Sequence, residues 1–137
     1  MLDAGPLIAF FYAKDTYHSY CVAVFSQLDA SQTALLTPIP IIFEVYKWLL
    51  HHSYGNVARR ALQIMNDKLQ TVALEEQTFN NLQKILTDLP NWKGSLENAT
   101  VVLTALQYDC PVWTYNYRDF SIFQSLEFWN PEDQLRD

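Results

Sequence analysis

The sequence predicts an α/β fold of three layers, α/β/α, in which a parallel sheet of about five strands lies between two layers of helices. Short apolar runs alternate with longer segments whose apolar residues recur with a period of 3.6. Half of the 137 residues are hydrophobic, and the three glycines leave little room for a flexible linker. We therefore expect residues 1–137 to form a single domain.

The expected strands are the short apolar runs, which end at polar or turn-forming residues. Only Met1 and Leu2 precede Asp3, whereas a strand usually spans about 5 residues. Either the native chain begins before Met1 or the first strand is short. The other expected strands cover residues 34–37, 69–74, 112–115 and 126–129.

The longer segments carry the helical period, and two of them have clear start signals. Ser95 is a favoured N-cap residue, and Pro40 suits the first turn of a helix. Because strands and helices alternate, the strands should be parallel and the helices should cover both faces of the sheet. The expected helices cover residues 6–13, 17–28, 41–52, 56–68, 76–89 and 96–108.

The charge and the cysteine content narrow the class of protein. A net charge of -6 and a pI near 4.9 argue against broad, sequence-blind nucleic-acid binding, which needs many Lys and Arg contacts. A nuclease with a local basic patch stays compatible with them. Cys21 and Cys110 are too few for a disulfide framework, and the sequence shows neither a leader nor a long apolar span. We expect a cytoplasmic protein that does not enter a membrane.

Carboxylates fall on segments that can meet at one edge of the predicted sheet. In an open parallel sheet, ligands bind beyond the carboxyl ends of the strands. Asp3 follows the first strand directly, and Glu44, Glu97 and Asp119 lie on later segments that can reach the same edge. Asp is also a favoured N-cap, so Asp3 has a structural alternative as the cap of the helix that Pro6 begins.

The polar side chains on the predicted helices 41–52 and 96–108 can also be explained without a functional site. Glu44 lies at the edge of an apolar stripe, where a surface pair with Lys47 at i, i+3 would explain it. Glu97 in the first turn behind Ser95 would stabilise the helix macrodipole without any ligand. Asn98 heads the apolar face of the same helix, so its amide needs a partner from the strand ends or from a bound ion.

Polar groups of four kinds lie at the end of the predicted strand at 112–115 and just after it. They are the hydroxyl of Thr114, the amide of Asn116, the guanidinium of Arg118 and the carboxylate of Asp119. Their place at a strand's carboxyl end fits a site. The structural alternatives are a strand-end role for Thr114, and for Asp119 a turn cap or a pair with Arg118.

Together these segments resemble the PIN-domain family, the fold of metal-dependent ribonucleases that include the toxin subunits of bacterial toxin-antitoxin pairs. The resemblance spans nearly the whole chain. Its carriers are residues 2–7, the Glu44 helix after residues 36–38, the helix start at 95–99 and residues 112–120. The family pattern has an Asp, then a Glu, then an Asp before a helix of small residues, then an Asp after a strand that ends in Thr.

The family's acids map onto this chain with two substitutions. Asp3 matches the first acid and Glu44 the second, but Asn98 falls at the third position. Asn116 falls at the fourth, more variable position, and Asp119 matches the acid that often precedes Phe in this motif. The resemblance thus implies catalytic Asp3, Glu44 and Asp119, metal ligands that also include Asn98 and Glu97, and supporting roles for Thr114 and Asn116.

The resemblance implies an endoribonuclease that hydrolyses RNA phosphodiesters with a water activated by Mg²⁺ or Mn²⁺, and an antitoxin protein as partner. Asn in place of Asp still offers an oxygen ligand but brings no negative charge. Each carboxylate–cation attraction that is lost near 4 Å is roughly 4 kcal/mol at an effective dielectric of ~20, before solvation offsets it. The alternative is a degenerate PIN module that has lost cleavage and binds RNA or a protein partner. A flavodoxin-like binding domain, with Asp3 and Glu44 far apart, is the third interpretation.

The aromatic residues indicate an interface. Eight Tyr, eight Phe and four Trp exceed the needs of a small core. The resemblance implies a homodimer, and the alternative is stacking of RNA bases on exposed Tyr. Lys47 and Arg118 are expected to contact RNA phosphates. The spacing of the three histidines does not suit zinc.

Overall fold

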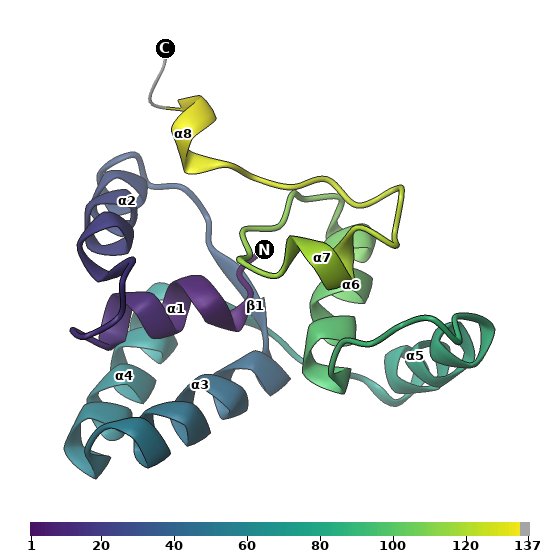
Figure 1. Cartoon of the computed structure of the whole chain (residues 1–137), viewed down its shortest axis with the longest axis horizontal. Helices are drawn as coiled ribbons and strands as arrows, with labels where there is room; N and C mark the ends of the chain where they lie inside the picture. Colours follow the sequence, from purple (N-terminus) through teal and green to yellow (C-terminus); the bar gives the residue numbers. More distant parts are fainter. Residues whose placement is uncertain (135–137) are drawn as a thin grey trace.

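The computed structural model describes residues 1–134 and places helices on both sides of a short central strand (Figure 1). In chain order the elements are α1 (Ala4–Phe11), α2 (His18–Ala30), β1 (Leu36–Pro38), α3 (Ile39–His52), α4 (Gly55–Lys68), β2 (Gln70–Val72), α5 (Glu76–Asp88), α6 (Leu96–Tyr108), α7 (Tyr117–Phe120) and α8 (Pro131–Gln134). Helices α1 to α4 lie on one side of β1, and α5 to α7 lie on the other.

Local sequence signals explain where several helices begin and end. The Ser95 hydroxyl accepts a hydrogen bond from the Asn98 amide at 3.0 Å and caps α6, which ends at Asp109 in the left-handed region (φ 50°). Pro40 lies in the first turn of α3, where its missing N–H costs nothing. Both predicted start signals are therefore confirmed.

The six predicted helices are confirmed as α1 to α6, with ends that move by at most two residues. Helix α1 begins at Ala4, directly after Asp3, rather than at Pro6. The sequence did not predict α7 and α8, because each has four residues and is too short to show a period of 3.6.

The predicted sheet of about five strands is not confirmed. Among residues 1–134 the sheet has two strands, β1 and β2, paired in parallel with Leu36 opposite Gln70. The remaining expected strands form isolated parallel bridges, Leu2 with Trp113 and Val112 with Phe128. The pairing of Leu2 with Trp113 is short because α1 begins two residues after Leu2, which leaves no room for a longer ladder.

Backbone hydrogen bonds nevertheless hold these short segments side by side. The Leu2 amide donates to the Leu36 carbonyl at 2.7 Å, and the Trp113 amide donates to the Met1 carbonyl at 2.9 Å. On the far side, the Trp129 amide donates to the Val112 carbonyl at 2.8 Å. The first residues of the chain thus lie between β1 and residues 112–114, and Asp3 and Thr114 emerge at the same edge.

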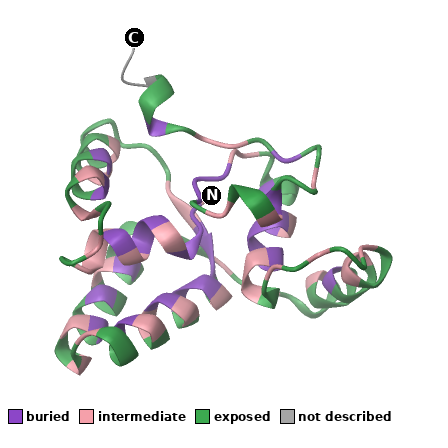
Figure 2. Ribbon diagram, in the orientation of Figure 1, coloured by how far each residue is buried: buried purple, intermediate pink, exposed green. Residues whose placement is uncertain are grey.

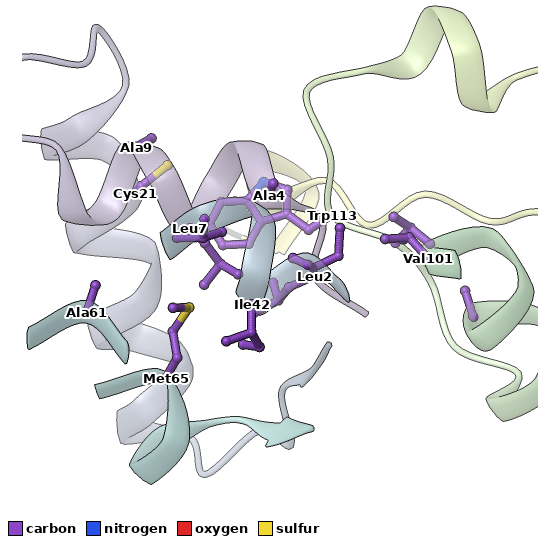
Figure 3. Close-up of a cluster of buried hydrophobic side chains, with 14 of the residues drawn as sticks. Leu2, Ala4, Leu7, Ala9, Cys21, Ile42, Ala61, Met65, Val101 and Trp113 are labelled. Carbon is purple, nitrogen blue, oxygen red and sulfur yellow. The ribbon is translucent and has the colours of Figure 1, made fainter. Parts of the chain in front are cut away.

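One cluster of buried apolar side chains joins α1, α2, α3, α4 and α6 to the central segments. Figure 3 shows Trp113 close to Leu2, Ala4 and Leu7 within this cluster. The helices turn their buried faces inward and their exposed faces outward (Figure 2). Within residues 1–134, none of the helices combines the length and apolar character needed to cross a membrane.

Two neighbouring leucines of α3 test this packing. Leu49 is completely buried, whereas Leu50 is 44% exposed. We expect Leu49→Ala to lower the free energy of unfolding by about 2–5 kcal/mol, because it leaves a cavity in the cluster. Leu50→Ala should change it by less than about 1 kcal/mol. Urea denaturation of both variants measures the difference, and equal losses would contradict the packing described here.

Candidate active site

Asp3 is a buried carboxylate, 4% exposed, at the junction between the first chain segment and α1. The hydroxyl of Thr114 donates to Asp3 Oδ2 at 2.6 Å, and Thr114 is itself fully buried. The Asn116 amide donates in turn to Thr114 Oγ1 at 2.9 Å. The end of the 112–114 segment therefore fixes the orientation of the Asp3 side chain.

The second oxygen of Asp3 has no partner. Oδ1 is buried and makes no hydrogen bond, and although Asp3 is the N-cap residue of α1, its side chain makes no capping bond. Helix capping therefore does not account for this side chain. Burial raises the pKa of Asp3 above its ordinary value, and the Thr114 hydroxyl and then the backbone amide of Ala4 oppose that rise.

Glu44 extends from α3 into the same region. Its Oε2 atom is buried without a hydrogen-bond partner. The pKa of Glu44 is raised from 4.5 to about 7, chiefly by burial and further by the negative charges of Asp3 and then Glu97. The charges of Asp3 and Glu97 therefore both reach Glu44, which contradicts the interpretation that placed Asp3 and Glu44 far apart.

The surface pair of Glu44 with Lys47 is not formed. Among residues 1–134, one ion pair is shorter than 4.0 Å. It joins Lys68 Nζ to Asp29 Oδ1 at 3.5 Å on the surface. Lys47 and Arg118 are both exposed, as a contact to an external phosphate requires. Neither therefore neutralises the predicted acids within the fold.

Asp119 is connected to Asp3 through two polar residues. The Asn116 side-chain amide donates to Asp119 Oδ2 at 3.0 Å, and Asn116 also contacts Thr114 through its backbone amide. The contacts thus run from Asp119 through Asn116 and Thr114 to Asp3. Asp119 is half-buried in the short helix α7.

Asn98 and Glu97 differ in their relation to the other acids. The Asn98 backbone amide is used by the Ser95 cap, and its side chain is half-buried. Glu97 is the neighbour whose charge reaches Glu44. Glu97 therefore supplies a negative charge near Glu44. It also occupies the first turn of α6, as a helix-stabilising acid would.

The donor set suits a hard divalent cation bound through few protein ligands. Within residues 1–134, no three His, Cys, Asp or Glu side chains are arranged to hold a metal ion. Mg²⁺ usually takes one or two carboxylates and keeps several waters. Asp3 Oδ1 and Glu44 Oε2 are buried carboxylate oxygens that lack partners, and a cation would provide one for both. The ligand roles of Asp119, Asn98 and Glu97 remain predictions.

The arrangement of the chain matches solved structures of VapC-type proteins. VapC20 of Mycobacterium tuberculosis, described as a sarcin-ricin loop cleaving toxin, is 14% identical with a TM-score of 0.75, over 89% of this chain and 93% of that one. VapBC-1 of nontypeable Haemophilus influenzae is 15% identical with a TM-score of 0.71, over 96% and 97% of the two chains. This chain has the PIN-domain fold.

A third PIN-type neighbour is VapBC2 of Rickettsia felis, solved with a DNA fragment from its promoter. It is 13% identical with a TM-score of 0.70, over 95% of this chain and 96% of that one. No protein-family model and no curated protein sequence matches the chain. The predicted PIN resemblance is confirmed for the fold. At identities of 13–15%, the similarity shows the fold alone.

Sequence reasoning on this PIN fold missed specific contacts rather than residues. It predicted a supporting role for Thr114, and the structure shows that the Thr114 hydroxyl donates a hydrogen bond to Asp3. It did not predict that Asn116 would bind Asp119 through its amide. The spacing N-x-x-D is the signal for that contact, because a short side chain reaches three residues on in a helical turn.

The raised pKa of Glu44 gives a pH test. Between pH 4.5 and about 7 the folded state binds more protons than the unfolded state, so stability falls as pH rises through this window. We expect Glu44→Gln, without metal, to be about 1–2 kcal/mol more stable than wild type at pH 8, after allowance for solvent screening. The gain should disappear near pH 4.5.

Urea denaturation in EDTA at several pH values measures this difference. Glu127→Gln is the matched control, since Glu127 is exposed. A gain for Glu44→Gln that is the same at every pH would show that the Glu44 pKa is not raised.

Proposed function

We propose that the chain, as one domain of residues 1–137, is a metal-dependent endoribonuclease and the toxin of a toxin-antitoxin pair. Asp3 and Glu44 hold Mg²⁺ or Mn²⁺, with Asp119 as the third catalytic acid and Glu97 or Asn98 completing the set. The observation that carries this proposal is the pair of buried, unpartnered oxygens on Asp3 and Glu44.

The fold supplies much of what such a site needs from the protein. Asp3 is held by Thr114, so little reorganisation of this ligand accompanies cation binding. The buried acids repel one another when charged, and a cation relieves that repulsion. When bound, Mg²⁺ or Mn²⁺ supplies Lewis acidity toward a phosphodiester and lowers the pKa of a water.

The proposed partners of the chain are an antitoxin protein and RNA. The neighbours include VapBC proteins, one of them bound to promoter DNA, and this supports an antitoxin partner for the chain. The exposed Lys47 and Arg118 are proposed to contact RNA phosphates. A homodimer and a cytoplasmic location complete the proposal. The homodimer is carried over from the PIN resemblance, and the location from the low cysteine content and the lack of a leader-like or long apolar stretch in the sequence.

Removing the charge of Asp3 tests the nuclease proposal. We expect calorimetric titration to show saturable Mn²⁺ binding to wild type and at least tenfold weaker binding to Asp3→Asn, because one of two buried carboxylates is lost. Metal-dependent cleavage of mixed single-stranded RNA should be lost with it. Unchanged cleavage by a folded Asp3→Asn variant would overturn the assignment.

Asp67→Asn serves as the matched control for this titration. Asp67 is exposed near the end of α4, so the variant changes the net charge by the same amount without touching the candidate site. Binding and cleavage should stay at wild-type levels. Equal losses in both variants would point to the net charge of the chain instead of a site at Asp3.

A second candidate function is a PIN module that binds RNA or a protein partner without cleaving. Two observations favour it: Asn occupies two of the positions where the family has acids, and residues 1–134 contain no group of three metal-binding side chains. In this case Asp3 and Glu44 are a remnant of the ancestral site. The exposed aromatic side chains would then provide the binding surface.

Restoring a charge at residue 98 distinguishes the two candidates. If the chain is a degenerate module, wild type should lack cleavage, and Asn98→Asp should raise Mn²⁺ affinity by roughly tenfold and create metal-dependent cleavage. Asn81→Asp on the exposed face of α5 is the control and should change neither. No gain in metal affinity for Asn98→Asp would show that residue 98 does not face the site.

A further inference from the structure

A hollow lined by tyrosines lies where residues 113–117 meet Tyr17, α2 and the start of α8. It has a volume of about 330 Å³, at the lower end of the range for small-molecule pockets. Tyr17, Tyr20, Tyr115 and Tyr117 line it. We name it the tyrosine pocket. The nuclease chemistry described above makes no use of these four rings.

Two of the rings form a fixed stack. Tyr17 and Tyr115 lie with their centroids 4.8 Å apart and their planes at 16°. The Tyr115 hydroxyl is 3.1 Å from the sulfur of the buried Cys21, which anchors the inner end of the stack. A Cβ atom at Gly5 would lie 3.2 Å from Tyr115 Cδ2, so the ring approaches α1 closely. The Tyr17–Tyr115 stack, which we call the platform, is therefore held in place by Cys21 and by α1.

The tyrosine pocket is open to a flat ligand. Tyr17 is 51% exposed and Tyr117 is 43% exposed, although neighbouring aromatic rings of this chain are buried in the core. Tyr117 also packs edge-on against Phe128, with centroids 5.1 Å apart, so its ring is supported from behind. Exposed aromatic faces with fixed positions favour stacking, since little side-chain entropy is lost when a ligand binds.

The pocket adjoins the row of contacts that leads to Asp3. Tyr115 stands between Thr114 and Asn116 in the chain, and these neighbours are the residues that contact Asp3 and Asp119. The tyrosine pocket and the contacts to Asp3 and Asp119 therefore share one segment of the chain, residues 114–117. A ligand in the pocket and the reacting group can belong to the same polynucleotide.

The charge of the pocket favours a base over a phosphate. Among the described residues that line it, Glu132 brings a carboxylate and no Lys or Arg is present. A carboxylate repels phosphate but accepts hydrogen bonds from the amino and imino groups of a base. An unpaired base, stacked on an aromatic ring, is also the usual mode of single-stranded RNA recognition.

We propose that the tyrosine pocket binds an unpaired nucleobase of the RNA by stacking on Tyr17, the more exposed ring of the Tyr17–Tyr115 pair, with Glu132 accepting a hydrogen bond from the base. This inference rests on the proposed RNA-cleaving or RNA-binding function. It names the part of the substrate that is recognised beside the acids. A protein side chain in the same place is the competing occupant, since Tyr is also enriched at protein interfaces.

The test measures binding of a short fluorescein-labelled single-stranded RNA in EDTA, by fluorescence anisotropy, so that no cleavage occurs. We expect Tyr17→Ala to weaken binding by about 5- to 100-fold, the range for one lost base stack, and Tyr17→Phe to stay within about twofold. Tyr108→Ala is the matched control, because Tyr108 is also 51% exposed but lies at the end of α6.

A second RNA in which every base is replaced by an abasic residue tests the wild-type protein itself and does not depend on how a variant folds. It should bind wild type more weakly than the normal RNA by a similar factor, and the two RNAs should bind Tyr17→Ala almost equally. Mn²⁺ binding to Tyr17→Ala should equal that of wild type.

The outcomes separate this inference from the proposed function. If Tyr17→Ala binds and cleaves RNA like wild type, the tyrosine pocket is not a base site and the nuclease proposal stands. If wild type neither binds nor cleaves RNA, both are overturned. If RNA affinity is unchanged but sedimentation shows that Tyr17→Ala converts a dimer to a monomer, the pocket is a contact between copies of the chain.

Discussion

The short hydrogen bond from Thr114 to Asp3 joins residues that are 111 positions apart and fixes the first carboxylate of the candidate site. It depends on the parallel pairing of Leu2 with Trp113, which places both side chains at one edge. Trp113 is among the largest fully buried side chains, so the pairing is also part of the core. The geometry of the site and the packing of the fold thus depend on the same few residues.

The same region contains two carboxylates in an electrostatically unfavourable position. Asp3 and Glu44 each bury an oxygen that has no hydrogen-bond partner, and each carboxyl has a raised pKa. A fold selected for stability alone would replace such groups with apolar or paired side chains. Asp3 precedes α1 and Glu44 lies within α3, and their unpartnered oxygens are the feature on which the proposed cation site rests.

Sequence reasoning identified the helices well and the sheet poorly, for physical reasons. Helices such as α3 and α6 carry long periodic patterns with a Pro or Ser start signal, which a single sequence displays clearly. The central segments pair over one to three residues, and no local pattern reports so short a ladder. Of the site, the sequence predicted the residue types, but the unpartnered oxygens and the charge of Glu97 near Glu44 depend on packing between distant segments.

The distance in sequence between Asp3 and Thr114 has a consequence for the timing of activity. During synthesis the chain leaves the ribosome from its N-terminus, and Asp3 emerges first without the hydroxyl that orients it. Helices α1 to α4 can pack before then, because their contacts are local. The site itself is completed only after the segment around Thr114 has emerged. Under the proposed function, the site cannot act before Thr114 has been synthesised and has packed against Asp3.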